Sequence, residues 1–242
     1  KDYSSVSVVI YDKALNSKSI NCSMKEDIIK YESKFELYSI SPSNGVKMSY
    51  WVNVPEGAHD NGRLVMFLHA DGAANRPYTV KEYIPVNFPE KYQGDKYILI
   101  APVANEDDWT RSATIRTLKA ILDKVADEYK VNKDEIYITG FSRGAIGTWV
   151  LANAYPGYFR GAMPVSCCGR IDGKNFKNMR VLAISGTSGQ EGKYISCMQK
   201  NVDKILAAGG VADKITYPGY GHGDTYSKMD YQGAFDWLFS KE

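Results

Sequence analysis

Residues Gly140, Phe141, Ser142, Arg143 and Gly144 form a G-x-S-x-G pentapeptide. An apolar run precedes it and predicts a buried strand, and a helical pattern follows it. A sharp strand-to-helix turn of this kind pushes a serine hydroxyl out of a sheet, where a base can remove its proton and make the oxygen a nucleophile. Glycines suit such a crowded turn because they carry no side chain. The alternative is a glycine-rich turn with an incidental serine.

In this context the pentapeptide resembles the nucleophile elbow of the α/β-hydrolase superfamily, over about residues 45–242. The sequence looks like the lid-free esterases of the feruloyl/acetylxylan esterase and polyhydroxyalkanoate depolymerase type. Further shared features are YWVNVP at Tyr50–Pro55, a strand ending in His69, and a loop with Trp109 after the next strand. The resemblance implies a mostly parallel twisted sheet with helices on both faces, N-terminal antiparallel strands and no lid domain. It also implies a carboxylic ester hydrolase.

The chain has three histidines, which are candidates for the base: His59, His69 and His222. His59 lies in a polar turn before a strand, far from the carboxyl ends where open α/β sheets bind ligands, so we expect it on the surface. The resemblance makes His69 a structural residue beside the oxyanion loop. It makes His222, between the last predicted strand and the last helix, the catalytic base.

The acid departs from the pattern of the family. The relatives resembled usually carry Asp in the loop after the strand that here spans Val181–Ser185, and that position reads Gly189. Glu191 supplies the carboxylate of this loop, and its extra methylene could compensate for a two-residue shift. A triad acid must orient the imidazole and stabilise imidazolium, which Glu can do. We therefore expect Glu191 to be the acid, with Asp224 and Asp172 as alternatives.

An oxyanion hole needs two backbone N–H donors. The elbow geometry assigns one to Arg143. The resemblance assigns the other to Asp71, although Ala70 stands where the family has glycine. The Asp71 side chain is expected to point away, because a carboxylate facing an oxyanion would raise the barrier.

The connection 166–179 is too short for a lid, which favours an open cleft for bulky or polymer-attached esters. Trp109 is a candidate substrate-binding residue that stacks on a sugar or aromatic ring; a loop anchor is the alternative. We expect a carbohydrate-linked or short-chain acyl ester as substrate. The alternatives are an acyltransferase using the same site and a non-catalytic carbohydrate-binding module on a degenerate scaffold.

Strands and helices alternate from residue 63 onward, which predicts a parallel sheet with helices on both faces. We expect one domain over 1–242, with an N-terminal extension at 1–45 and a catalytic core at 46–242. The expected elements are strands at Val6–Tyr11, Phe35–Ser41, Lys47–Val54, Leu64–Leu68, Tyr97–Pro102, Glu135–Thr139, Gly161–Val165, Val181–Ser185 and Lys214–Tyr217, and helices at Ser112–Tyr129, Gly144–Tyr155, Tyr194–Ala208 and Met229–Ser240.

Composition excludes several classes of protein. The 242 residues include 30 Lys+Arg and 28 Asp+Glu, interleaved to a net charge of +2, which argues against nucleic-acid binding. The longest apolar runs of the chain are only as long as a β-strand, so we expect no membrane-spanning segment. No cysteine or histidine spacing matches a zinc site, and triad chemistry needs no metal or organic cofactor.

For the oligomeric state, we expect a monomer or weak dimer.

The four cysteines are Cys22, Cys167, Cys168 and Cys197. We expect Cys22 to be a small buried hydrophobe. Cys168 (or Cys167) and Cys197 each follow a strand, and these two strands should be neighbours, so a disulfide is possible in an oxidising compartment. Four free thiols are the alternative. The chain begins with Lys1, which suggests a processed fragment and favours a secreted or cell-surface location over a cytoplasmic one.

Overall fold

The computed structural model describes residues 5–11, 17–23, 35–56, 58, 61–84, 94–106 and 108–240, with only the backbone described in the first two ranges. The chain forms two compact units, Lys1–Lys34 and Phe35–Glu242. The predictions for His59 and for the side chain of Cys22 lie outside the described residues. The prediction of one domain with a boundary at residue 45 remains a prediction.

The first unit contains two strands, β1 (Ser5–Tyr11) and β2 (Ser17–Ser23). They pair antiparallel, with Ser5 opposite Ser23 and Tyr11 opposite Ser17. The apolar run that predicts a strand at Val6–Tyr11 coincides with β1. Strand β2, which is rich in serine and other polar residues, was not predicted.

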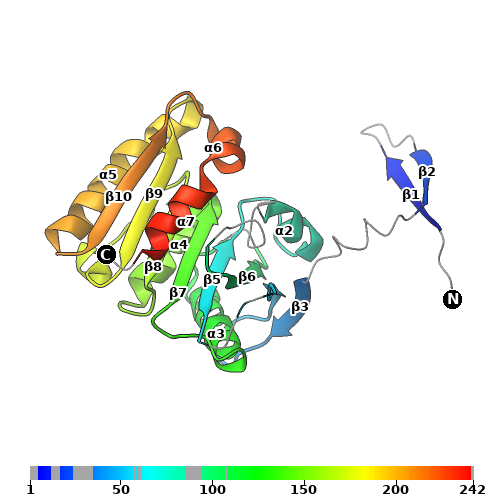
Figure 1. Ribbon diagram of the computed structural model, residues 1–242, viewed down its shortest axis with the longest axis horizontal. Helices are drawn as coiled ribbons and strands as arrows, with labels where there is room; N and C mark the ends of the chain where they lie inside the picture. The colour runs from blue at the N-terminus through cyan, green and yellow to red at the C-terminus, as the bar shows by residue number, and fades with distance from the viewer. Residues whose placement is uncertain are drawn as a thin grey trace. The chain divides into compact units, whose positions relative to one another are not determined.

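The second unit is built on an eight-stranded sheet in the order β10-β9-β8-β7-β5-β6-β4-β3 (Figure 1). Strand β4 is antiparallel to both its neighbours, β3 and β6, and all other neighbours in the sheet are parallel. The strands span Phe35–Ile40 (β3), Met48–Asn53 (β4), Arg63–Leu68 (β5), Tyr97–Val103 (β6), Ile136–Phe141 (β7), Gly161–Val165 (β8), Arg180–Gly186 (β9) and Val211–Tyr217 (β10).

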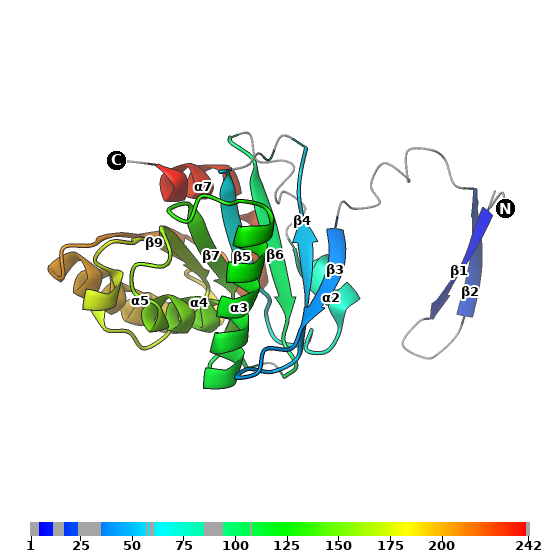
Figure 2. The same cartoon turned by 90° about the horizontal axis from the view of Figure 1, so that it is seen from below.

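Helices cover both faces of this sheet, as Figures 1 and 2 show from two directions. The buried side chains of α3, α4 and α5 pack with one hydrophobic cluster, and those of α2 and α7 with the cluster on the other face. The helices span Pro77–Tyr83 (α2), Ser112–Glu128 (α3), Arg143–Ala154 (α4), Gly192–Ala207 (α5), His222–Lys228 (α6) and Tyr231–Phe239 (α7), with short 3-10 turns at Gly173–Phe176 (η1) and Gly189–Glu191 (η2).

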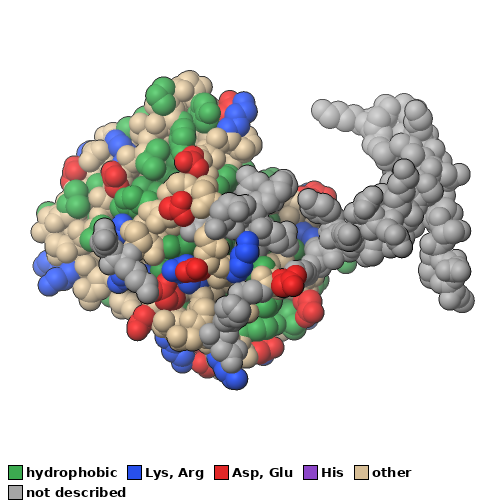
Figure 3. Space-filling view, viewed as in Figure 1, with side chains coloured by type: hydrophobic (Ala, Val, Ile, Leu, Met, Phe, Trp, Pro, Cys, Tyr) green, Lys and Arg blue, Asp and Glu red, His purple; other side chains and the backbone are tan. Residues whose placement is uncertain are grey.

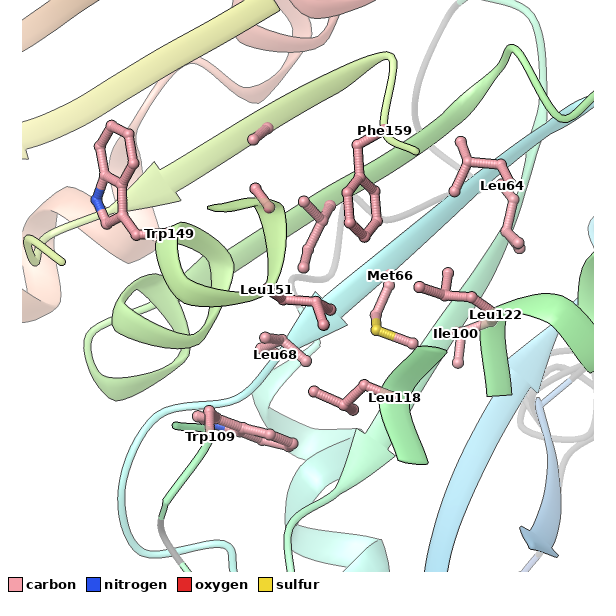
Figure 4. Packing of buried hydrophobic residues seen from close by; sticks show 14 of the residues in the cluster. Leu64, Met66, Leu68, Ile100, Trp109, Leu118, Leu122, Trp149, Leu151 and Phe159 are labelled. Atoms are coloured by element: carbon pink, nitrogen blue, oxygen red, sulfur yellow. The ribbon is translucent and has the colours of Figure 1, made fainter. Parts of the chain in front are cut away.

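Alternation along the strands explains the two clusters. In β5, Leu64, Met66 and Leu68 belong to the α3 side, whereas Val65 and Phe67 belong to the α7 side. Successive side chains of a strand point to opposite faces, so a strand covered on both faces must be apolar throughout. Figure 4 shows Met66 and Leu68 near Leu118 and Leu122 of α3. The continuous apolar runs in the sequence therefore correspond to the central strands.

The predicted fold class is confirmed: the sheet is mostly parallel, carries helices on both faces and begins with antiparallel strands. Two helical details differ. The expected helix Met229–Ser240 is preceded by a separate helix, α6, that begins at His222. Helix α2 was not predicted, and of its side chains only that of Val80 is buried, so its hydrophobic pattern is weak.

One disulfide distinguishes between the alternatives for Cys167, Cys168 and Cys197. Cys168 and Cys197 form a disulfide, whereas Cys167 is a buried free thiol. Cys168 follows β8, and Cys197 lies on α5, the helix after the neighbouring strand β9.

None of the helices among the described residues is long and apolar enough to cross a membrane. On the molecular face in Figure 3, Lys and Arg side chains are interspersed with Asp and Glu.

Candidate active site

The strand-to-helix turn after β7 is sharply constrained. Ser142 has φ of 57° and ψ of −115°, a backbone conformation that non-glycine residues rarely adopt. A Cβ on Gly144 would lie 1.9 Å from the carbonyl oxygen of Leu68, and one on Gly140 would lie 2.4 Å from that of Gly144. Neither position accepts a side chain. Both glycines are therefore required for α4 to pack directly against β5 and β7.

Three residues from three elements form a continuous hydrogen-bonded chain. Ser142 Oγ lies 2.8 Å from His222 Nε2, and His222 Nδ1 lies 2.6 Å from Glu191 Oε1. Ser142 follows β7, Glu191 ends η2 after β9, and His222 starts α6 after β10. Because these strands are parallel, their carboxyl ends lie at one edge of the sheet and bring the three residues together. With Nδ1–H donated to Glu191, Nε2 is free to accept the serine proton.

The Glu191 side chain is completely buried, and both of its oxygens are bound. Oε1 bonds to His222, whereas Oε2 accepts hydrogen bonds from Ser185 Oγ at 2.7 Å and from the Gly186 N–H at 3.0 Å. Burial alone would raise the pKa of Glu191, but the hydrogen bonds from His222, Ser185 and Gly186 outweigh it and lower the pKa below its ordinary value. The carboxylate therefore stays ionised beside the imidazole.

The alternative acids lie in different surroundings. Asp224 is half-exposed and forms an ion pair with Lys228, one turn further along α6. Asp172 caps η1 by accepting a hydrogen bond from the Lys174 N–H. Among the candidate acids, the structure thus places Glu191 against His222.

The two residues assigned to the oxyanion hole are joined through their side chains. Arg143 Nε lies 2.9 Å from Asp71 Oδ1, and Arg143 Nη2 lies 3.3 Å from Asp71 Oδ2. Arg143 is the first residue of α4, and Asp71 begins the turn after β5. The Asp71 carboxylate is thus engaged in a bidentate ion pair, and its expected turning away from an oxyanion stays a prediction. The pair links the two loops whose amides are the proposed donors.

Trp109 lies in the core and not at the surface of a cleft. Its side chain has no exposed area, and its Nε1 donates to the carbonyl of His69 at 3.0 Å. A Cβ on Gly147 of α4 would lie 2.5 Å from the Trp109 Cβ, so this side chain packs directly against α4, and Figure 4 shows the indole beside Leu68 at the end of β5. This burial contradicts the prediction that Trp109 stacks on substrate. The alternative, a loop anchor, matches the structure.

His69 is also buried and holds two loops together. Its Nε2 accepts a hydrogen bond from the Ala104 N–H at 3.2 Å, so Nδ1 carries the proton and donates to the Ala70 carbonyl at 2.6 Å. These bonds tie the loop after β5 to the loop after β6. The geometry agrees with the structural role that the resemblance implies for His69.

Several residues that contact these side chains were missed by the sequence analysis. Ser185 and Gly186 bind Glu191 from the end of β9, and the ring of Phe141 lies 4.6 Å from that of His222. A Cβ on Gly186 would lie 2.1 Å from the Tyr220 carbonyl, which shows how closely the His222 segment approaches β9. A Ser-Gly pair at a strand end, just before the acid-bearing loop, is the signal that could have been used.

Within the described part of the chain, no group of three or more His, Cys, Asp or Glu side chains could hold a metal ion.

Comparison with known proteins places this geometry in a wider context. No family model matches the sequence. Poly(3-hydroxyalkanoate) depolymerase C from Paucimonas lemoignei is 28% identical over 194 residues, which cover 76% of this chain and 42% of that protein. The chain therefore spans about two fifths of the length of this relative.

Solved structures share the fold. A thermostable esterase superposes with a TM-score of 0.74 at 22% identity, covering 96% of this chain and 70% of the other. Acetyl xylan esterase from Aspergillus awamori gives a TM-score of 0.63 at 14% identity, with 84% and 98% covered. The strand order, the elbow and these likenesses together establish that the chain has the α/β-hydrolase fold.

Proposed function

We propose that this chain hydrolyses carboxylic esters through a covalent acyl-enzyme on Ser142. The observation that carries the proposal is the hydrogen-bonded chain Ser142–His222–Glu191. His222 takes the Ser142 proton as the oxygen attacks the carbonyl, and later passes it to the departing alcohol. Water then attacks the acyl-enzyme with His222 again as the base. Glu191 fixes the imidazole tautomer and stabilises imidazolium.

The negative charge of the tetrahedral intermediate needs donors at the elbow. We assign this role to the main-chain amides of Arg143 and Asp71. The ion pair between their side chains supports the assignment, because it holds the start of α4 and the turn after β5 together. Preorganised donors of this kind are each worth about 3–4 kcal/mol of transition-state stabilisation.

The proposed substrate is an uncharged ester, either carbohydrate-linked or of a short acyl chain. Three observations support this choice. The similar proteins include a poly(3-hydroxyalkanoate) depolymerase and an acetyl xylan esterase. The connection from β8 to β9 contains only a short 3-10 turn, and the His222 side chain keeps 24% of its surface exposed. Both features favour an open site that admits an ester attached to a larger molecule.

The test combines a fluorophosphonate probe with an ester panel of nitrophenyl acetate, nitrophenyl butyrate, acetylated xylan and methyl ferulate. We expect the probe to label the wild type and Ser227→Ala but not Ser142→Ala. Ser227 is a suitable control because its hydroxyl lies on exposed α6 and bonds to the Gly223 carbonyl. Labelled Ser142 without hydrolysis, but with acyl transfer to an added alcohol or sugar, would indicate the acyltransferase. Absence of labelling, together with sugar binding, would indicate the non-catalytic module.

We also propose a secreted or cell-surface location. The Cys168–Cys197 disulfide supports it, because disulfides persist mainly in oxidising compartments.

A further inference from the structure

Two residues of the segment 166–169, which follows β8, contact one face of α5, the helix after Glu191. Cys168 is disulfide-bonded to Cys197, and the carbonyl of Gly169 accepts a hydrogen bond from Asn201 Nδ2 at 2.8 Å. The contacted residues lie on α5 four positions apart, and neighbours at this spacing share one face of a helix. Helix α5 begins directly after Glu191. The strand end beside the nucleophile is therefore attached to the helix that follows the acid.

Cys167 adds a contact nearer to the acid. Burial raises the pKa of its thiol, and a side-chain hydrogen bond with Tyr194, in the first turn of α5, acts in the opposite direction. The Cys167 carbonyl accepts a hydrogen bond from Trp149 Nε1 of α4 at 3.3 Å. This residue therefore lies between α4, which follows the nucleophile, and α5, which follows the acid.

Ser166 is the most unusual member of the segment. It is completely buried, its φ of 59° lies in the left-handed region, and its hydroxyl has no hydrogen-bond partner. Its N–H donates to the carbonyl of Ile184 at 2.8 Å, which joins Ser166 to the end of β9, where Ser185 binds Glu191. A buried hydroxyl and a strained backbone are both unfavourable, and such features concentrate at functional sites.

We propose that residues 166–169 form a clasp that positions the Glu191 carboxylate against His222, with Ser166 as its polar part and the Cys168–Cys197 disulfide as its covalent part. These are positioning residues, and their role rests on the proposed function. Glu191 lies where η2 passes into α5, so a shift of the first turns of α5 moves its carboxylate. The 2.6 Å bond to His222 leaves little tolerance for such a shift. A misplacement of about 1 Å can reduce a rate by roughly 100-fold.

A double-mutant cycle separates positioning from general destabilisation. Cys168→Ser/Cys197→Ser is made in the wild type and in Glu191→Gln, and kcat and KM are measured where circular dichroism shows every variant folded. We expect kcat to fall by roughly 10- to 100-fold in the wild-type background, with little change in KM. In the Glu191→Gln background we expect less than about a twofold further loss, since the group being positioned is already absent. Equal losses in both backgrounds, or no loss in the wild type, would overturn the proposal.

Ile205→Ala is the matched control for stability. Ile205 is completely buried in the last turn of α5, eight residues after Cys197, so its truncation loosens the same helix near its other end. We expect kcat close to that of the wild type while the variant is folded. A loss as large as that of the disulfide variant would show that any destabilisation of α5 is sufficient, and would refute a specific clasp.

Two substitutions test the Ser166 hydroxyl. Ser166→Gly removes the hydroxyl and relieves the positive φ, whereas Ser166→Ala removes the hydroxyl and keeps the strain. We expect both to lower kcat several-fold with little change in KM, although Ser166→Gly has the higher Tm. Full activity in Ser166→Gly would remove Ser166 from the clasp.

Wild-type protein provides the check on the underlying function. If it is neither labelled by fluorophosphonate nor active on any ester, the proposed function has failed. If it is labelled and active but the cycle shows no coupling to Glu191, the clasp alone has failed.

Discussion

Glu191 is a buried carboxylate whose charge depends on a few hydrogen bonds. Its two oxygens accept from His222, Ser185 and Gly186, and its side chain has no exposed area. A buried charge is tolerated only when it is well paired, so removing one partner leaves the others unsatisfied. Substitution of Glu191 should therefore change both catalysis and the pH dependence of stability.

Glu191→Gln keeps the shape of the side chain and removes its charge. The amide can no longer stabilise imidazolium, and it can favour the wrong imidazole tautomer. We expect kcat to fall by about 10³- to 10⁴-fold, as for comparable triad acids. Steady-state hydrolysis of nitrophenyl acetate measures the effect. Asp224→Asn is the control and should stay near wild-type activity, because Asp224 pairs with Lys228 on the surface; the reverse outcome would assign the acid to Asp224.

The lowered pKa of Glu191 also predicts a pH dependence of stability. The folded state holds this carboxyl below its unfolded pKa, so its ionised form stabilises the fold at pH values above the unfolded pKa. That stabilisation is lost as the pH falls below about 4.3 and through the folded pKa. Urea unfolding of wild type and Glu191→Gln should show a difference in unfolding free energy at pH 7 that shrinks by pH 3. A difference independent of pH would contradict the assignment.

At the scale of elements, the elbow is a close contact between helix α4 and strand β5. The helix begins at Arg143 and passes so near β5 that its second residue must be glycine. Close approach also explains the burial of Trp109, because Gly147 on the same helix leaves the space that the indole fills. The site is thus held by packing between α4 and the sheet.

Gly144→Ala tests this contact. The new Cβ would lie 1.9 Å from the Leu68 carbonyl oxygen, so α4 or β5 must shift. We expect a loss of about 3 kcal/mol or more in unfolding free energy, together with loss of Ser142 labelling. Gly223→Ala is the matched control in helix α6, where an added Cβ meets no atom within 4 Å. Equal stability of the two variants by chemical denaturation would show that the elbow can relax.

At the scale of the molecule, both hydrophobic clusters and the eight-stranded sheet belong to the unit Phe35–Glu242. A sheet of this size with helices on both faces contains its own core. All the described residues of the proposed site lie in this unit as well.

A chain that begins at Phe35 should therefore fold without residues 1–34. We expect its Tm to lie within a few degrees of that of the full chain and its kcat to be within about twofold, because both clusters remain intact. Thermal unfolding and ester hydrolysis of the two chains, side by side, make the comparison. Aggregation or loss of cooperative unfolding in the shorter chain would instead support the prediction of one domain over 1–242.

Local sequence patterns were sufficient for the fold class. The apolar runs at Leu64–Leu68 and Tyr97–Pro102 predict strands buried on both faces, and the helical stripe over Ser112–Tyr129 predicts α3. These signals are local, since burial on one face or on both follows from periodicity alone. The signal of the G-x-S-x-G turn is also local. Its glycines avoid steric clashes within one strand–helix unit and with the neighbouring strand.

Contacts between distant segments could not be predicted in this way. The sequence favours Glu191 by its place in the loop after a strand but leaves Asp224 and Asp172 as alternatives, and only the fold shows that Glu191 lies 2.6 Å from His222. The burial of Trp109 likewise depends on α4, which comes much later in the chain. The sequence by itself determined a parallel α/β sheet with a serine on a strained turn. The tertiary structure decided which carboxylate meets the histidine, because that choice depends on how parallel strands align their ends and not on local pattern.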